Sequence, residues 1–280
     1  MLVSYVLKQL KNGLLLIRRS IELLNLNVTQ GNSLSINTIL KNNMKIALLG
    51  YGKMGREVEK IALEQGHQIV VTFDNENDWN EKSAKLKECD VAIEFSMPAI
   101  VVGNILKCLK AGIPVVVGTT GWYDQFQDIS DKCNITNGTL FYATNFSIGV
   151  NIFSVINRRL ASLLVDYPMY SPSMVEIHHT QKLDAPSGTA ISLANDIISE
   201  NPRFTKFTTT NPEAGEIPVQ SLREGNVPGT HSITWKSDID QITITHEAFN
   251  RRGLALGAVM AASWLSGRKG IFTMSDMLNL

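Results

Sequence analysis

The sequence predicts an α/β fold, in which a Rossmann-type doubly wound parallel sheet is joined to a second α+β domain with a mixed sheet. Three observations predict it. An apolar strand, a glycine-rich turn and a helix follow one another over residues 45–65. Strands and helices then alternate to about residue 145, and beyond it the alternation becomes irregular. Regular alternation is typical of a parallel sheet covered by helices, and irregular order is typical of an α+β unit.

The bulk composition excludes several classes of protein. The chain has 280 residues, of which 44% are hydrophobic and 19% charged, and its formal net charge is zero. No long-range field or basic stripe is therefore available to attract nucleic acid. No apolar run approaches the roughly 18 residues of a membrane span. We expect a small-molecule partner, no nucleic acid and no membrane.

Cysteine usage fits a reducing compartment. The three cysteines, Cys89, Cys108 and Cys133, are odd in number and show no CxxC spacing. This pattern predicts neither a disulfide framework nor a zinc site. We expect ordinary thiols in a cytoplasmic protein.

The first 43 residues are set apart by their composition. They contain five basic residues and one acidic residue, and an Asn/Ser-rich stretch follows a short apolar cluster at 14–24. A basic, acid-poor leader is typical of a transit peptide, and an upstream in-frame extension is the alternative. Because Met44 opens a natural first strand, we expect residues 1–43 to be a poorly structured leader or extension outside the fold.

The first strand, residues 45–49, runs into a glycine loop that precedes a helix expected at 56–65. In a dinucleotide-binding loop Gly50 makes the tight turn, Gly52 lets the backbone approach a pyrophosphate, and Gly55 allows close packing of helix and strand. The free N–H groups at the helix N-terminus then face the anion. The predicted cofactor-binding loop is Gly50, Tyr51, Gly52, Lys53, Met54 and Gly55.

A second strand, residues 68–73, ends at Asp74, which lies 22 residues after Gly52. An acidic side chain at this place can accept hydrogen bonds from the ribose hydroxyls of a dinucleotide. Asn75 follows rather than an arginine, so nothing obvious pairs with a 2′-phosphate. The pattern favours NADH over NADPH.

The alternation continues with a strand at 90–95, a helix at 98–110 and a strand at 114–118. Ligands of such sheets lie beyond the carboxyl ends of the strands, where polar loops follow here. Further cofactor contacts are therefore expected from Gly118, Thr119, Thr120, Ala143, Thr144, Asn145 and Phe146. We expect a dinucleotide-binding domain at 44–148, completed by residues 251–280, because a helix at 253–265 returns to it.

The second half has the character of a substrate-binding domain at 149–250. Expected helices lie at 150–164 and 189–200, with a Pro-rich turn at Pro168 and Pro172 between them. Expected strands lie at 174–178, 219–223, 232–236 and 241–247.

The chemically dense stretch runs from Glu176 to Ala190. His178 and His179 are adjacent, and neighbouring side chains on a strand point to opposite faces unless the strand ends there. Lys182 follows, and Ser187, Gly188 and Thr189 open a helix whose N–H groups can hold a carboxylate. No third metal ligand stands at a useful spacing, so we expect no metal. Glu176 is either an orienting partner or a solvent-facing strand residue.

This stretch, Glu176-Ile177-His178-His179 through Lys182 and Asp184-Ala185-Pro186-Ser187-Gly188-Thr189-Ala190, resembles the signature of the 4-hydroxy-tetrahydrodipicolinate reductases. The resemblance covers residues 44–280. It extends to the glycine loop, to 118–121, to 145–151, to Arg223-Glu224-Gly225 and to Gly229-Thr230-His231. One departure is Glu94-Phe95-Ser96, where Asp-Phe-Thr/Ser is more usual.

The resemblance implies NADH- or NADPH-dependent reduction of 4-hydroxy-tetrahydrodipicolinate to tetrahydrodipicolinate in the diaminopimelate route to lysine. By resemblance, His178 is the expected proton donor, with Lys182 as the second candidate. His179, Lys182, Gly188 and Thr189 are expected to bind the substrate carboxylates. Family members are typically homotetramers built through the second domain's sheet.

Two other functions stay open on the residues alone. One is another two-domain Rossmann dehydrogenase of amino-acid metabolism, although an aspartate-semialdehyde type needs a nucleophilic cysteine in a recognisable turn. The other is a regulator that senses NAD(H) without turnover, which would not require His178 and Lys182.

Overall fold

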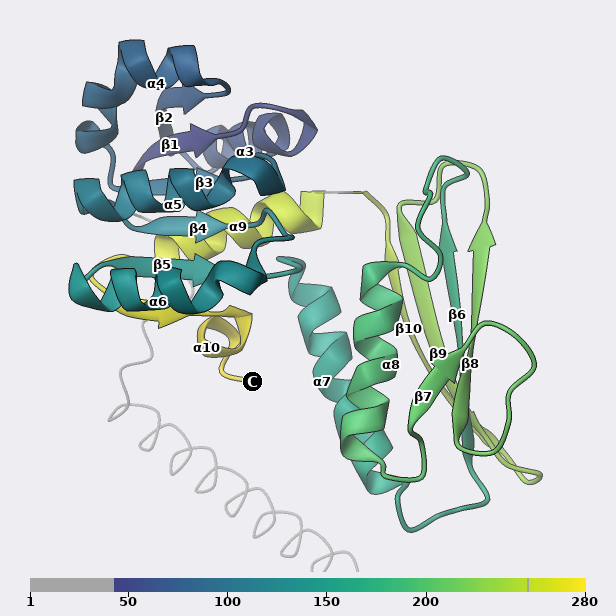
Figure 1. Ribbon diagram of the computed structural model, residues 1–280. Coiled ribbons are helices and arrows are strands. Elements are labelled where there is room, and N and C mark those ends of the chain that lie inside the picture. Colours follow the sequence, from purple (N-terminus) through teal and green to yellow (C-terminus); the bar gives the residue numbers. More distant parts are fainter. Residues whose placement is uncertain (1–42, 251) are drawn as a thin grey trace, which may run out of the picture. The chain divides into compact units, whose positions relative to one another are not determined.

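A computed structural model describes residues 43–250 and 252–280 (Figure 1). The prediction of a leader at 1–43 thus lies outside the described residues, apart from Asn43. Residues 43–280 form one compact unit that contains two sheets.

The first sheet has six strands in the order β11-β5-β4-β3-β1-β2, and all neighbouring strands are parallel. It confirms the predicted Rossmann-type fold. Its strands are β1 (Lys45–Leu49), β2 (Gln68–Phe73), β3 (Val91–Glu94), β4 (Val115–Val117), β5 (Thr139–Tyr142) and β11 (Gly270–Phe272).

Alternate residues of each strand pack into two separate hydrophobic cores, one on each face of this sheet. Ile46 and Leu48 of β1 pack with α3 and α9, whereas Ala47 and Leu49 pack with α5 and α6. This is the burial expected of strands that are covered on both faces. The helices of this half are α3 (Lys53–Glu64), α4 (Glu76–Lys82), η1 (Ser83–Glu88), α5 (Pro98–Ala111), η2 (Tyr123–Gln125), α6 (Phe126–Ile135), α9 (Arg252–Trp264) and α10 (Met274–Leu278).

The second sheet has the order β10-β9-β6-β8-β7 and is mixed, as predicted. Its central strand β6 pairs antiparallel with β9 and parallel with β8. Helices α7 (Ile148–Leu163) and α8 (Gly188–Glu200) lie side by side against one face, where a third core forms (Figure 1). The strands are β6 (Ser171–His178), β7 (Lys206–Thr208), β8 (Glu216–Arg223), β9 (Gly229–Lys236) and β10 (Gln241–Ala248).

Several boundaries differ from the predictions, and the starts of α3, β6, β8 and β9 each come three residues early. The first helix begins at Lys53, three residues before the expected start, so Lys53, Met54 and Gly55 belong to its first turn. Strand β6 begins at Ser171, so Pro172 lies in the strand and not in the expected turn. Pro172 is buried there, on the inward-facing side of the strand.

The sequence interpretation named no helix at α4, α6 or α10, and no strand at β5, β7 or β11. The strands among these are short, and β11 pairs with β5 across more than 120 residues of sequence. Local periodicity carries little signal for such elements. In the described part of the chain, none of the helices combines the length and apolar character required to cross a bilayer.

Candidate active site

Strand β6 carries the two side chains at the centre of the site, Glu176 and His178, and both point to the helix-covered face. The strand alternates between inward and outward residues and ends at His178. His179 therefore begins the following loop, as the polar residues after it indicated. A strand end at this point releases the next residues from the alternation of the pleat.

Glu176 is fully buried and is held from both sides. One carboxylate oxygen, Oε1, accepts hydrogen bonds from Arg223 Nη2 at 3.0 Å and from the Ser187 backbone N–H at 3.3 Å. The other oxygen contacts Nδ1 of His178. Burial raises the pKa of Glu176, but the Ser221 hydroxyl, the hydrogen bond from Arg223 and the charge of His178 together outweigh it, and the pKa lies below its usual value. Glu176 is thus an ionised partner of His178 and not a solvent-facing strand residue.

His178 is buried, and its pKa is lowered by that burial and by the positive charges of Lys182 and Arg223. The attraction to Glu176 opposes this effect. Because Nδ1 faces Glu176, Nε2 is the ring nitrogen that remains for exchange with a ligand. A carboxylate on one ring nitrogen fixes the orientation of an imidazole and determines which nitrogen can react.

Lys182 is paired in this structure with Asp184, whose two oxygens both lie 2.8 Å from Nζ. The ammonium lowers the pKa of Asp184. The loop that carries this pair is tied down by Arg223, which donates to the Asp184 carbonyl at 2.6 Å and to the Lys182 carbonyl at 3.3 Å. Arg223 therefore links the buried Glu176 to the loop of Lys182.

Helix α8 presents its N-terminus next to these groups. Ser187 is the N-cap residue, and its hydroxyl accepts from the Ala190 N–H at 3.2 Å. The N–H groups of Gly188 and Thr189 lie in the first turn, where no carbonyl of the preceding turn is available to them. The helix dipole adds positive potential at this end, so the N-terminus of α8 suits a carboxylate.

A cavity of 580 Å³ brings these elements together with loops of the first sheet. It collects His178, Lys182, Gly188 and Thr189 of the predicted site with Thr120, Thr144 and Asn145 of the predicted cofactor loops. His179 does not line it. The lining residues are Thr120, Gly121, Tyr123, Thr144, Asn145, Val150, Asn151, Ser154, His178, Lys182, Ser187, Gly188, Thr189, Ser192, Leu193 and Asp196.

Sequence reasoning missed the role of His231. It lies opposite Glu176 on β9, its ring centroid is 5.2 Å from that of His178, and its Nε2 lies 3.2 Å from the Ser187 hydroxyl. With Glu176 and His178 it forms a group of three buried donors close enough to share an ion. The sequence shows no third metal ligand at a useful spacing, but the sheet register brings in a histidine 53 residues from His178. The absence of a metal stays a prediction.

The glycine loop has the geometry expected of an anion-binding turn. Gly50 adopts a φ of +87°, and a Cβ there would lie 2.4 Å from the Phe95 carbonyl oxygen. A Cβ on Gly55 would lie 2.2 Å from the Gly50 carbonyl oxygen, which confirms close packing of helix and strand. At Gly52 nothing lies within 4 Å, and α3 has no side-chain cap. Open space and uncapped N–H groups fit the pyrophosphate of a dinucleotide.

Asp74 lies beside this loop, because its Oδ1 accepts from the Tyr51 N–H at 2.8 Å. Its own N–H donates to Asp78 Oδ2 at 2.8 Å, so a second carboxylate stands next to it. Asn75 caps α4 by accepting from the Asp78 N–H. Asp78 is in turn paired with Lys82 Nζ at 2.6 Å, so Asp74 is the carboxylate of this pair that suits a hydroxyl donor.

The remaining loops predicted to bind the cofactor are tightly packed. The Phe95 ring excludes any side chain at Gly118, where a Cβ would lie 2.1 Å from it. Thr119 is buried, and its carbonyl accepts from Trp122 Nε1 at 2.9 Å. Phe146 is also buried and packs against Phe95, so only its backbone can face a ligand.

The unusual Glu94 is fully buried at the end of β3. One carboxylate oxygen contacts the Ser96 hydroxyl and accepts from the Ser96 N–H at 3.2 Å and from Asn104 Nδ2 at 3.3 Å. Burial raises its pKa, and these hydrogen bonds oppose the rise. The longer side chain therefore ties the loop after β3 to α5.

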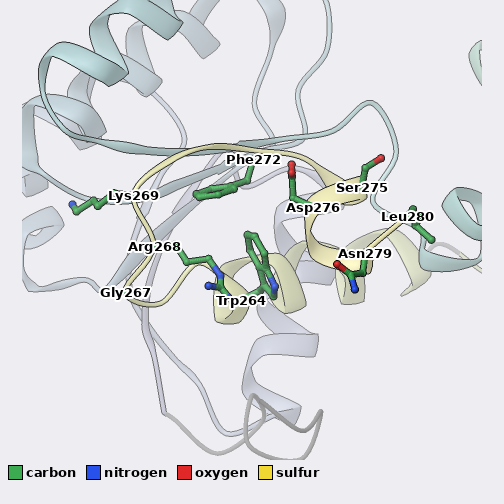
Figure 2. A pocket seen from close by; sticks show the side chains of 9 residues that line it. All are labelled: Trp264, Gly267, Arg268, Lys269, Phe272, Ser275, Asp276, Asn279 and Leu280. Atoms are coloured by element: carbon green, nitrogen blue, oxygen red, sulfur yellow. The ribbon is translucent and has the colours of Figure 1, made fainter. Parts of the chain in front are cut away.

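Figure 2 shows another pocket, of 730 Å³, at the C-terminal end of the chain. It contains no predicted site residue. The Arg268 guanidinium lies 4.1 Å above the Trp264 ring, and Asp276 caps α10 through Thr273. Arg268 and Asp276 are thus engaged in structural contacts. The residues around it are Trp264, Gly267, Arg268, Lys269, Phe272, Ser275, Asp276, Asn279 and Leu280.

Comparison with known proteins gives a consistent result. The family described as "Dihydrodipicolinate reductase, N-terminus" matches residues 44–146, and "Dihydrodipicolinate reductase, C-terminus" matches residues 149–278. The chain is 46% identical over 239 residues to a 4-hydroxy-tetrahydrodipicolinate reductase of Christiangramia forsetii, covering 84% of this chain and 98% of the relative. A protein of the same name from Rickettsia bellii is 37% identical over 229 residues, covering 80% and 90%.

A solved structure is similar in fold. It is described as dipicolinate-bound dihydrodipicolinate reductase from Paenisporosarcina sp. TG-14. The TM-score is 0.67 at 22% identity, and the match covers 84% of this chain and 99% of the other.

Proposed function

The chain belongs to the dihydrodipicolinate reductase family, and we propose that its reaction uses His178 as the proton donor. We propose further that Lys182 and the N-terminus of α8 bind the substrate carboxylates, and that NADH is the preferred cofactor. The activity is that of a nicotinamide-dependent oxidoreductase, the reduction of 4-hydroxy-tetrahydrodipicolinate in lysine biosynthesis. The observation that carries the proposal is the shared cavity. It joins His178, Lys182 and Thr189 to the loops of the parallel sheet.

The reaction needs one hydride and one proton for each substrate reduced. When bound, the reduced nicotinamide supplies the hydride to C4 of the ring. His178 is suited to donate the proton from Nε2, because its other ring nitrogen, Nδ1, contacts Glu176. An imidazole near neutral pH can both release and regain a proton within one turnover.

The two substrate carboxylates find complementary groups in the same cavity. The Gly188 and Thr189 N–H groups with the Thr189 hydroxyl suit one carboxylate at the α8 N-terminus. For the other, Lys182 would exchange its exposed partner Asp184 for the substrate, since an ammonium can rotate freely on its stem. His179 remains a predicted substrate ligand that lies in the loop beside this cavity. A dicarboxylate ligand agrees with the name of the dipicolinate-bound structural neighbour.

The preference for NADH rests on Asp74, because the neighbouring Asp78 is ion-paired with Lys82. A ribose 2′-hydroxyl can donate to Asp74, whereas a 2′-phosphate would be repelled by its carboxylate. The cofactor residues proposed here are Gly50, Tyr51, Gly52, Lys53, Met54, Gly55, Asp74, Gly118, Thr119, Thr120, Ala143, Thr144, Asn145 and Phe146.

A homotetramer built through the second sheet and a cytoplasmic location complete the proposal. The sheet face away from α7 and α8 carries the exposed hydroxyl pairs Ser232–Thr245 and Thr234–Thr243. The three cysteines are free and buried. Light scattering after gel filtration measures the assembly, and a monomer at micromolar concentration would contradict it.

One assay tests the activity and its competitors. Reduced nicotinamide is followed at about 340 nm with purified protein and with the hydroxylated ring substrate generated in situ by condensation. Oxidation that depends on this substrate supports the proposal. Binding of NADH without oxidation would instead favour a sensing role, and oxidation with a different carbonyl substrate only would favour another dehydrogenase.

A further inference from the structure

Three titratable side chains form a row across the second sheet. Glu176 on β6 is paired in register with His231 on β9, and His231 is paired with His246 on β10. Residues paired in this way point to the same face, here the one covered by α7 and α8. Because β10 is an edge strand, the row leads from the partner of His178 to the border of the sheet.

A small cavity of 170 Å³ adjoins this row. It is separate from the 580 Å³ cavity but shares His178, Asn145, Val150 and Thr189 with it. His231, His246 and Asn250 add polar groups to its lining. At about 30 Å³ per water molecule, it has room for a few waters with several polar partners each.

His178 also lines this small cavity, next to Gly229. A Cβ on Gly229 would lie 2.9 Å from His178 Nε2, so only a glycine fits beside this nitrogen. His178 is therefore a wall residue of both cavities, with substrate proposed on one side of it.

The two other histidines differ in their surroundings. His231 is buried, its Nε2 lies against Ser187, and burial followed by repulsion from His178 lowers its pKa to about 4, so it is neutral near pH 7. His246 is partly exposed, and its Nδ1 is buried without a hydrogen-bond partner among the described residues. Burial lowers the pKa of His246 as well. Among these three residues, His246 thus combines partial exposure of its side chain with a ring nitrogen that has no partner among the described residues.

We infer that His246 delivers, through water in the small cavity, the proton that reprotonates His178 after each turnover. The inference rests on the proposed function, because NADH, a proton and the hydroxylated substrate together give NAD⁺, the reduced ring and water. The proton passes from solvent to His246, then to cavity water, and then to Nε2 of His178. No electron moves in this step.

The test compares His246→Gln with the wild-type chain in weak buffer near pH 7, with substrate and NADH saturating. Glutamine keeps polarity but cannot carry a proton through titration. We expect kcat to fall about tenfold or more, and added imidazole at tens of millimolar to restore at least half of it. The matched control is Glu247→Gln, because Glu247 is the exposed neighbour on the opposite face of β10. Its kcat should equal that of the wild type with or without imidazole.

Wild-type kcat for His246→Gln in weak buffer would overturn the inference, and so would a loss that imidazole does not restore, since that points to a structural role. Should His246→Gln not fold, His246→Asn provides the same comparison with a smaller side chain. The proposed function is judged separately, by substrate-dependent NADH oxidation of the wild-type chain.

Discussion

The carboxylate of Glu176 contacts Nδ1 of His178, two residues further along the same strand, and both side chains are buried. A charged partner on one ring nitrogen leaves the other nitrogen for proton transfer. Sequence spacing permitted this contact, because residues i and i+2 of a strand share a face.

Glu176→Gln should lower kcat by about tenfold or more, because the amide cannot stabilise the imidazolium of His178. Since Glu176 raises the pKa of His178, its loss should also move the His178-dependent limb of the kcat profile to lower pH. A pH series of kcat measures both effects. Glu200→Gln, at the exposed end of α8, serves as the control, and an unshifted profile in Glu176→Gln would refute the orienting role.

His178→Gln removes the proposed acid itself. We expect kcat to fall by about 10²-fold or more with a modest change in KM, as is usual when an acid–base contribution is lost. Steady-state kinetics with NADH give both constants. Undiminished turnover would exclude His178 as the proton donor.

Lys182→Ala should impair catalysis and substrate binding together, lowering kcat/KM by roughly 10- to 100-fold, since hydrogen bonds to charged groups are worth about 1.5–3 kcal/mol. Asp184→Asn is the matched comparison, because it removes the partner of Lys182 and keeps the ammonium. It should change KM more than kcat. Equal kinetics of Lys182→Ala and the wild type would remove Lys182 from the site.

The buried His231 should make the free energy of unfolding depend on pH. Its pKa is about 4 in the folded chain and 6.5 in the reference state, so the unfolded chain binds a proton more readily between these values. The free energy of unfolding should therefore decrease as pH falls from 6.5 to 4, by about 3 kcal/mol from this residue. Urea unfolding at several pH values tests this against His231→Asn, whose loss across the same range should be smaller. Identical pH slopes would contradict it.

Asp74→Ser should shift cofactor preference towards NADPH, because a carboxylate that repels the 2′-phosphate is removed. We expect the ratio of kcat/KM for NADH to that for NADPH to fall about tenfold, which corresponds to about 1.4 kcal/mol. Glu76→Gln, an exposed change on α4, is the control. A preference of the wild type for NADPH would contradict the proposal before any variant is made.

Most of the parallel sheet was predictable from sequence, because its signals are local. The strand at 45–49, the glycine turn and the strand at 68–73 appear with the predicted bounds. The helix start was missed by three residues, since Lys53 and Met54 carry no start signal beyond the glycine before them. Strand β11 was missed because a three-residue strand gains its identity only by pairing with β5.

The candidate site shows the same division between features that local sequence predicts and features that only the fold determines. The sequence by itself determined that His178, Lys182 and the helix start at Ser187–Thr189 belong to one site. They lie within a dozen residues of one another, so they cannot be far apart in space. Only the tertiary structure decided that Arg223 holds Glu176 from β8 and that His231 and His246 stand in register with it. Strand register depends on the packing of whole sheets, which no local pattern of residues encodes.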